Sequence, residues 1–229
     1  LYHVCVFLWG FTAVFGKIID LQATLLVWWR MGITSLILLC IPALWKTIRN
    51  IDKKTLLQLA GIGVLVTCHW ISFYGSIKAS NISVALTCLA TTSFFVSVFE
   101  PLMFNKKFIW YELILAVLVI PAIYLIFHFS GSYTEGIILG LASTIFATLF
   151  SLLNKKMISK TAPLNITFIE IAVGFVLLSI VLPFYMQTQQ DVKFWPTKMD
   201  TVNLILFSTL CTVVPFTLSL YCMRHISVF

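Results

Sequence analysis

Three ionisable side chains lie well inside long apolar runs of the sequence: Arg30, His69 and Glu170. A charge in membrane hydrocarbon costs roughly 2.5–3.5 kcal/mol on insertion scales, so such groups usually face a partner or a water-filled cavity. Arg30 suits a substrate carboxylate or a structural partner. Glu170 suits a proton or cation site, or a hydrogen bond to a neighbouring helix. His69 is compatible with proton coupling, with substrate contact and with a structural hydrogen bond between helices.

Aromatic residues accompany these groups inside the runs. Trp9, Trp70 and Tyr74 predict an aromatic wall for apolar side chains or organic cations, with ordinary helix packing as the alternative. Lys17 lies near the end of the first run. It suits either a lysine that reaches the membrane interface or a gate charge that meets an anionic substrate group.

Gate or coupling candidates are found near other run ends: Glu100, Asn154 and Lys155. Glu100 is equally placed to reach water or to pair with Lys106 or Lys107. None of the six cysteines forms a CxxC pair, and all fall in apolar stretches, so they are interpreted as small buried hydrophobic residues. We therefore predict no metal site, no cofactor and no catalytic residue.

The composition requires a membrane environment. Hydrophobic residues make up 60% of the 229 positions and charged residues 10%, and the mean hydropathy is +1.03. Soluble domains carry about 45–50% apolar and about 25% charged residues. The sequence therefore predicts an all-α polytopic membrane protein and excludes nearly every soluble enzyme fold.

A spanning helix needs about 20 mostly apolar residues. Eight runs meet this requirement: approximately 1–19, 24–45, 55–77, 82–104, 109–129, 136–153, 164–186 and 201–223, and a ninth begins at Ile226. The polar separators are short, so consecutive helices are expected to be antiparallel neighbours. A stripe of small residues in the sixth run predicts close helix packing: Gly136, Gly140, Thr144, Thr148 and Ser151.

Lysine and arginine counts predict the orientation. With the N-terminus in the cytoplasm, ten of these residues lie in cytoplasmic loops and three, namely Lys78, Lys193 and Lys198, on the opposite side. This bias follows the positive-inside rule. The net charge of +7 therefore reports topology, and no nucleic-acid partner is predicted.

The chain also contains a weak internal repeat. Matching features recur in order: Lys17 and Lys155 (138 residues apart), Arg30 and Glu170 (140 apart), and Tyr74 and Tyr221 (147 apart). A repeat of about five spans must enter the membrane from opposite sides in its two copies, as in many secondary transporters. We predict a first five-helix repeat at 1–135 and an incomplete second repeat at 136–229, with two further spans expected beyond Phe229.

The sequence resembles the drug/metabolite transporter superfamily, of the EamA type. The residues that carry the resemblance are Trp9-Gly10, Lys17, Arg30, Tyr74 to Lys78 leading into Ser80 and Ser83, Glu100-Pro101 with Lys106-Lys107 and Glu112, Gly136 to Gly140, and Asn154-Lys155-Lys156. The resemblance implies ten spans in two inverted five-span repeats, and this chain departs from that pattern with about eight. It further implies a carrier for small metabolites in a prokaryotic inner membrane. Such carriers often export amino acids or related compounds, although the substrate itself does not carry over.

The function predicted is a secondary active or facilitative transporter that works by alternating access. Its expected partners are a small-molecule substrate and the lipid bilayer, and a homodimer stays open. A membrane scaffold without transport is the first alternative. An intramembrane enzyme is a weaker one, because His69 and Glu100 differ in depth by about 15 Å at 1.5 Å per residue. Known hydrolase motifs such as HExxH and GxSxG are also absent from the sequence.

Overall fold

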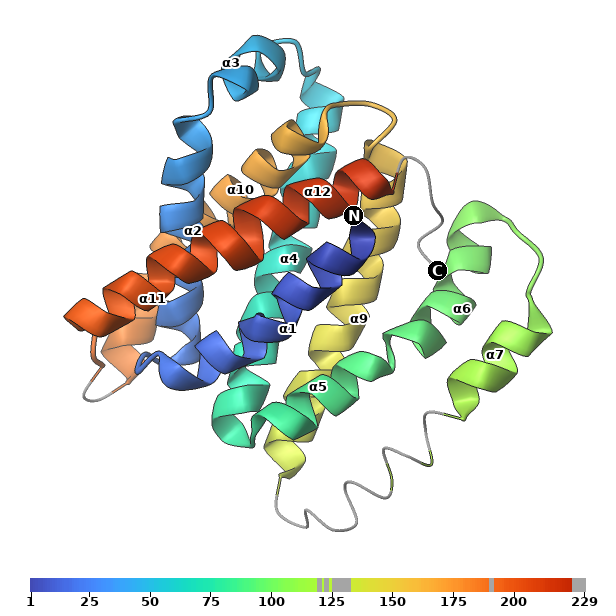
Figure 1. Cartoon of the computed structure of the whole chain (residues 1–229), viewed down its shortest axis with the longest axis horizontal. Coiled ribbons are helices and arrows are strands. Elements are labelled where there is room, and N and C mark those ends of the chain that lie inside the picture. The colour runs from blue at the N-terminus through green and yellow to red at the C-terminus, as the bar shows by residue number, and fades with distance from the viewer. Residues whose placement is uncertain (119–120, 122–123, 125–132, 190–191, 224–229) are drawn as a thin grey trace.

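Every regular element in the described part of the chain is helical (Figure 1). The computed structural model describes residues 1–118, 121, 124, 133–189 and 192–223. Its α-helices are α1 (Tyr2–Ile18), α2 (Ala23–Leu39), α3 (Pro42–Ile48), α4 (Lys53–Ala79), α5 (Ile82–Ala90), α6 (Thr92–Phe104), α7 (Trp110–Val117), α9 (Thr134–Met157), α10 (Pro163–Thr188), α11 (Lys198–Ser208) and α12 (Val214–Cys222). A short π-helix, η1 (Thr209–Val213), joins α11 to α12.

Five helical segments of the described chain are long and apolar enough to cross a membrane: Lys53–Ala79, Ile82–Phe104, Thr134–Met157, Pro163–Thr188 and Lys198–Cys222. The pair α2 and α3 makes a sixth if it counts as one span, and α1 is a shorter apolar helix of 17 residues. These segments coincide with runs predicted from the sequence. The count of eight spans and the repeat of five plus five stay predictions.

The second predicted run is not one continuous helix. The axes of α2 and α3 differ by 86°, and the break falls immediately before Pro42, which begins α3. Proline disfavours a helical conformation in the preceding residue, and Ile41 is accordingly extended. Of the fifth run, α7 covers the beginning, and most of the rest lies outside the described residues, as do Arg224 and the run expected from Ile226.

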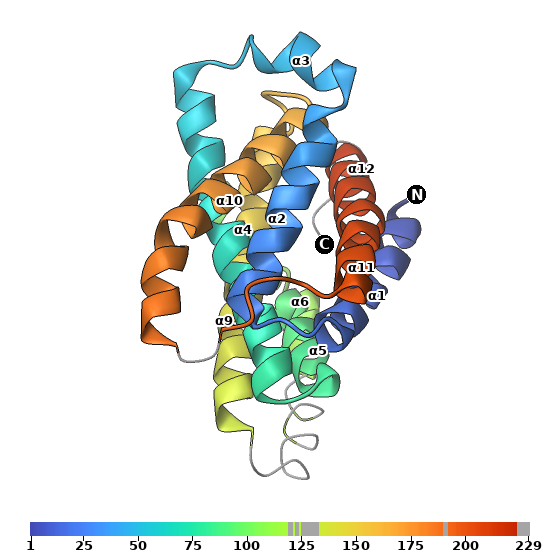
Figure 2. The ribbon, with the colours of Figure 1, turned by 90° about the vertical axis from the view of Figure 1, so that its left-hand side faces the viewer.

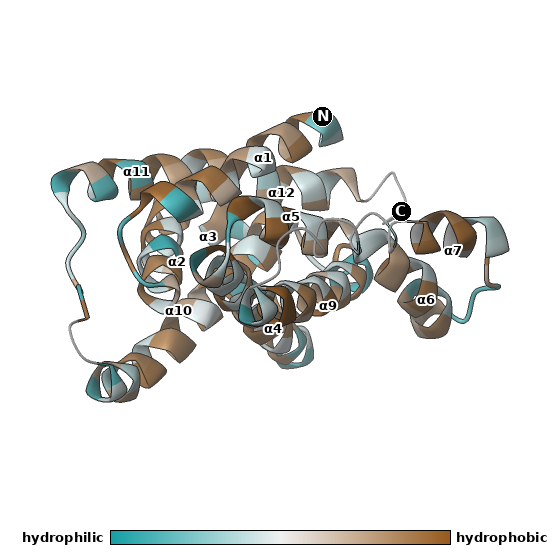
Figure 3. Cartoon of the chain, turned by 90° about the horizontal axis from the view of Figure 1, so that it is seen from below, coloured by the Kyte–Doolittle hydropathy of each residue, from teal (hydrophilic) through white to brown (hydrophobic). Residues whose placement is uncertain are grey.

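Helix α4 lies at the centre of the bundle. It packs against α9, α10 and α2, while α1 runs beside α12 across the same bundle (Figures 1 and 2). Hydrophobic residues dominate the helices, and hydrophilic ones gather mainly at helix ends and loops (Figure 3). Large apolar side chains are exposed on the outside, among them Phe7, Leu57, Leu102 and Phe184. Such a surface suits lipid rather than water.

Small residues bring the central helices together. A Cβ atom added to Gly136 would lie 2.5 Å from Ser80, and one added to Gly140 would lie 2.8 Å from Cys88. The close packing predicted for the small-residue stripe of α9 is therefore confirmed at these two glycines. Gly63 of α4 approaches α10 in the same way, since its added Cβ would lie 2.7 Å from the backbone oxygen of Glu170.

Candidate functional site

A cavity of about 280 Å³ lies inside the bundle. Its wall combines aromatic rings, including those of Trp9, Trp70, Phe73 and Phe150, with a few polar groups from α1, α2, α4 and α9. Apolar walls with a small number of placed polar groups are the usual form of a small-molecule site. The cavity is therefore the first candidate for a functional site.

The guanidinium of Arg30 is the cationic group in this wall. It is buried, with 2% of the residue exposed. The Arg30 Cζ atom lies 3.8 Å from the ring centroid of Trp70 and 4.0 Å from that of Phe207. Aromatic faces attract a cation most strongly when water is excluded. These two rings from α4 and α11 therefore stabilise a charge that the apolar bundle would otherwise disfavour.

Hydrogen bonds fix the orientation of Arg30. Its Nη1 donates to the hydroxyl of Tyr74 at 2.5 Å, and its Nε donates to Oγ1 of Thr212 at 2.9 Å. Its Nη2 donates to the carbonyl of Cys211 at 3.4 Å. Pro215 lies four residues after Cys211 and has no N–H, so it cannot donate to that carbonyl as a regular helix would. The proline and the adjacent π-helix thus leave an acceptor for the arginine.

Arg30 has no carboxylate partner among the described residues, where the ion pairs are Lys106 with Glu100 and Lys193 with Asp20. A guanidinium carries five N–H groups, and the bonds above use three of them. Two N–H donors of this cavity-wall residue therefore form none of these bonds.

His69 reaches the cavity from α4 and is anchored on α9. Its Nδ1 lies 2.9 Å from the carbonyl oxygen of Ser143 and 2.8 Å from the hydroxyl of the same residue. Because a carbonyl oxygen only accepts, we assign a hydrogen to Nδ1. The ring also packs against Phe73 and Phe150. This is the arrangement of a hydrogen bond between helices, and it leaves one edge of the imidazole at the cavity.

Glu170 is fully buried on α10, and its carboxyl group contacts Asn154 of α9. The Nδ2 of Asn154 donates to Oε2 of Glu170 at 3.2 Å. Asn154 is 1% exposed and lines the cavity, whereas Glu170 does not. Glu170 and Arg30 form no ion pair with each other, so two ionisable groups of opposite sign lie separately in one bundle.

A family model matches residues 1–128 and 134–229, nearly the whole chain. The chain belongs to the EamA-like transporter family. It is therefore a membrane protein of a family that transports small molecules, and the family resemblance stated from the sequence is confirmed. A solved structure described as "Crystal structure of protein" has the same fold, with a TM-score of 0.71 at 12% identity over 99% of this chain and 79% of that one. No curated protein matches the chain.

The transporter fold brings six of the predicted residues to the cavity wall: Trp9, Arg30, His69, Trp70, Tyr74 and Asn154. The other four lie elsewhere. Glu100 forms an ion pair with Lys106 at 2.7 Å. This pair is one of the alternatives that the sequence analysis gave for Glu100. Lys17 is exposed on α1, and Lys155 donates to the carbonyl of Met223. With Glu170, these residues are separate from the cavity lining.

Sequence reasoning missed the partners that hold Arg30, namely Phe207 and Thr212. Their positions follow from the rotation of α11 and η1 against α2, which no local pattern fixes. Pro215 was the available signal, because a proline inside an apolar run frees a carbonyl that a buried donor can use.

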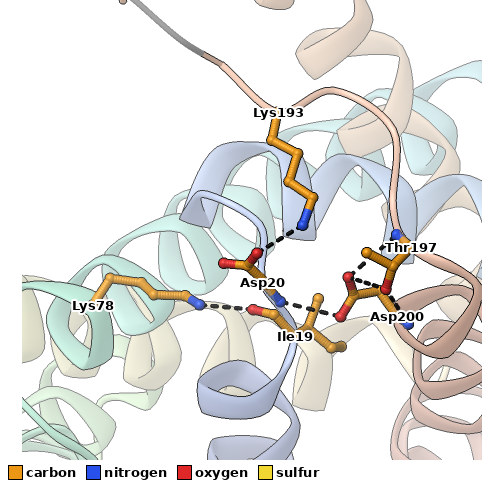
Figure 4. A network of polar contacts seen from close by, with 6 residues as sticks. All are labelled: Ile19, Asp20, Lys78, Lys193, Thr197 and Asp200. Carbon is orange, nitrogen blue, oxygen red and sulfur yellow. Dashed lines mark hydrogen bonds and ion pairs between the residues drawn. The ribbon is translucent and has the colours of Figure 1, made fainter.

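A polar network lies at the end of the EamA-like bundle where α1 ends and α2 begins (Figure 4). No sequence pattern indicated it. Asp20 accepts from Lys193 at 2.6 Å, and its backbone N–H donates to Asp200 at 3.2 Å. Lys78 donates to the carbonyl of Ile19 at 2.8 Å. The hydrogen bond to Asp20 raises the pKa of Lys193. The network ties the loop between α1 and α2 to the ends of α4 and α11, and none of its residues lines the cavity.

Proposed function

We propose that this EamA-like transporter is a secondary active or facilitative carrier that moves a small metabolite through the cavity by alternating access. Export of an amino acid or a related compound is the leading case. The observation that supports it is Arg30, a buried cation at the cavity wall without a carboxylate partner in the described chain. A substrate carboxylate would accept from the two unused N–H donors and neutralise the charge.

The rest of the wall fits the remainder of an amino acid. Aromatic rings such as Trp9 and Phe150 offer apolar contact to its side chain. Histidine and asparagine side chains, His69 and Asn154, offer hydrogen bonds at other points of the wall. One charged anchor and several apolar faces favour a small molecule with a carboxylate at one end.

The described conformation suits one half of a transport cycle. The Asp20 network joins loops at one end of the bundle, while the cavity lining extends toward the other end, to Tyr2 and Asn154. Under the positive-inside orientation, the joined end faces away from the cytoplasm. We propose that this state receives substrate from the cytoplasm and that the repeats then rock to open the Asp20 end.

A flux experiment tests the carrier. The full chain is reconstituted in liposomes, and uptake of a mixture of ¹⁴C-labelled amino acids is measured for wild type, Arg30→Gln and Lys17→Gln. Loss of a hydrogen bond to a charged group is worth about 1.5–3 kcal/mol, so Arg30→Gln should reduce uptake at low substrate by roughly 10- to 100-fold. Lys17→Gln removes an exposed lysine outside the cavity and should change little.

The outcomes separate the alternatives. If Arg30→Gln elutes as a monodisperse protein and transports at the wild-type rate, Arg30 is not the anchor. If wild type moves none of the labelled compounds, the amino acid assignment is wrong, and a protein that moves no member of a wider metabolite panel would support the scaffold alternative.

A further inference from the structure

Two buried oxygen atoms of the Glu170–Asn154 pair have no hydrogen-bond partner in the described structure. They are Oε1 of Glu170 and Oδ1 of Asn154. The pair is joined through its other atoms, since Nδ2 of Asn154 donates to Oε2 of Glu170. An unsatisfied buried polar atom costs about 1–3 kcal/mol, and more if it is charged. Two such atoms on two side chains already in contact therefore call for a physical explanation.

Both unsatisfied atoms are acceptors. Ionised glutamate and the asparagine carbonyl oxygen accept hydrogen bonds and cannot donate, whereas a protonated carboxyl group gains one O–H donor. A proton on Oε1 would let Glu170 donate to Oδ1 of Asn154 while Asn154 continues to donate to Oε2. One proton would thus satisfy both atoms and close a two-bond pair between the acid and the amide.

No cation compensates an ionised carboxylate at this position in the described chain. The described basic groups of the elements around Glu170 either form other hydrogen bonds or are exposed. Those with other partners are Arg30 on α2 (Tyr74 and Thr212), His69 on α4 (Ser143), Lys78 on α4 (Ile19), Lys155 on α9 (Met223) and Lys156 on α9 (Met103). Those that are exposed are Lys46 on α3 and Lys53 and Lys54 on α4. The titratable side chains of α12 are a phenol, Tyr221, and a thiol, Cys222. The hydrogen bond from Asn154 is the one hydrogen bond of the Glu170 carboxyl group among the described residues. An ion without a partner in an apolar interior is strongly disfavoured.

We propose that Glu170 and Asn154 form a proton-binding site, in which Glu170 is protonated in the described conformation and Asn154 connects the pair to the cavity. Binding forms one O–H bond on the carboxylate, and the proton comes from water on one side of the membrane. Release returns the proton to water when the wall around Asn154 opens. No other reactant is needed. This inference rests on the proposed carrier function only where it concerns coupling.

A proton fits this site better than a metal cation. The two side chains offer three oxygen atoms, and no cluster of three or more His, Cys, Asp or Glu residues that could hold a metal occurs in the described chain. Hard cations such as Ca²⁺ take six to eight oxygen ligands.

Infrared difference spectroscopy of the full chain in lipid nanodiscs tests the site without any substrate. The proton itself is the probe, and the signal is the carbonyl stretch of a protonated carboxylic acid. Wild type should show this band at neutral pH, and Glu170→Gln should lose it. Glu100→Gln, in which the removed carboxylate pairs with Lys106, is the matched control and should retain it. Asn154→Leu should keep the band but move it to higher frequency, because the acid carbonyl loses its hydrogen bond.

Glutamine is a conservative replacement here. Its amide supplies the donor that Oδ1 of Asn154 lacks, so Glu170→Gln mimics the protonated state and should fold. A wild-type spectrum without the band at neutral pH, or a band that survives in Glu170→Gln, would overturn the proposal. Either result would mean that the Glu170 carboxylate is ionised, for example because a bound water donates a hydrogen bond to Oε1.

Coupling to transport has its own readout. In liposomes with the ¹⁴C amino acid mixture, Glu170→Gln should keep exchange at equal pH but lose the extra accumulation that a pH gradient drives in wild type. Equal gradient-driven accumulation in both proteins would refute coupling through Glu170. Absence of uptake by wild type would count against the amino acid carrier, while the infrared band would still decide the proton site.

Discussion

The contact between Gly63 and α10 makes a quantitative prediction. In Gly63→Ala, the new Cβ would lie 2.7 Å from the carbonyl oxygen of Glu170 and 3.0 Å from its Cα. Backbone atoms cannot rotate away, so α4 and α10 must separate. Overpacking of this kind costs about 1–3 kcal/mol. Replacing glycine by alanine in a helix contributes about 0.5–1 kcal/mol in the opposite direction, which leaves a net loss between about 0 and 2.5 kcal/mol.

Gly61 provides a matched control two residues away on the same helix. A Cβ atom added there meets nothing within 4 Å, so Gly61→Ala should be neutral or stabilising by about 0.5–1 kcal/mol. Because the helix-propensity contribution is the same in both variants, their difference isolates the packing cost of about 1–3 kcal/mol.

Reversible unfolding of the full chain in mixed detergent–SDS micelles, followed by tryptophan fluorescence, measures both free energies of unfolding. Equal stability of the two alanine variants would refute the close approach of α4 to α10. It would also remove the steric support for the position of Glu170.

Two further predictions concern exposed groups. Because the hydrogen bond to Asp20 raises the pKa of Lys193, its stabilising contact is fully present below the ordinary lysine pKa of about 10.4 and is lost as pH rises through the raised value. The thermal midpoint of wild type should therefore exceed that of Lys193→Met slightly at neutral pH and converge with it in strong alkali; a constant difference would contradict this. Cys40 is exposed, so the interpretation of all six cysteines as buried is wrong at this position. In folded protein, maleimide should modify Cys40 well before buried Cys88 and Cys211, and Cys40→Ala should remove the fast phase seen by mass spectrometry.

The sequence predicts where the helices lie along the chain better than it predicts which helix faces pack together. Apolar run length locates α4, α9 and α10 because a bilayer imposes one physical length on every span. It fails at the boundary of α2 and α3, where a local steric rule at Pro42 breaks an otherwise uniform apolar run.

The same distinction holds for the candidate site, where the sequence predicts the polar residues but not the partners that hold them. A rare polar or ionisable residue in an apolar run signals its own importance, which is why the sequence alone predicts Arg30, His69 and Asn154 as candidates. Their partners are common residue types such as Phe207 and Thr212, and only the packing of α11 and η1 against α2 selects them. For Lys17, the position near the end of an apolar run indicates its depth in the membrane but not the direction in which its side chain points. The side chain is exposed.

The two buried ionisable groups place a joint constraint on any transport cycle. Arg30 keeps its charge because aromatic faces and a freed carbonyl stabilise it, whereas Glu170 has one amide contact. If Glu170 carries a proton, the empty cavity region has a net charge of about +1, and a substrate carboxylate neutralises it. If Glu170 releases that proton while substrate is bound, an ionised carboxylate stays in an apolar bundle without a counter-charge, which is strongly disfavoured. Proton release should therefore follow substrate release, when Asn154 and its surroundings can admit water, and this order would make proton and substrate movements interdependent.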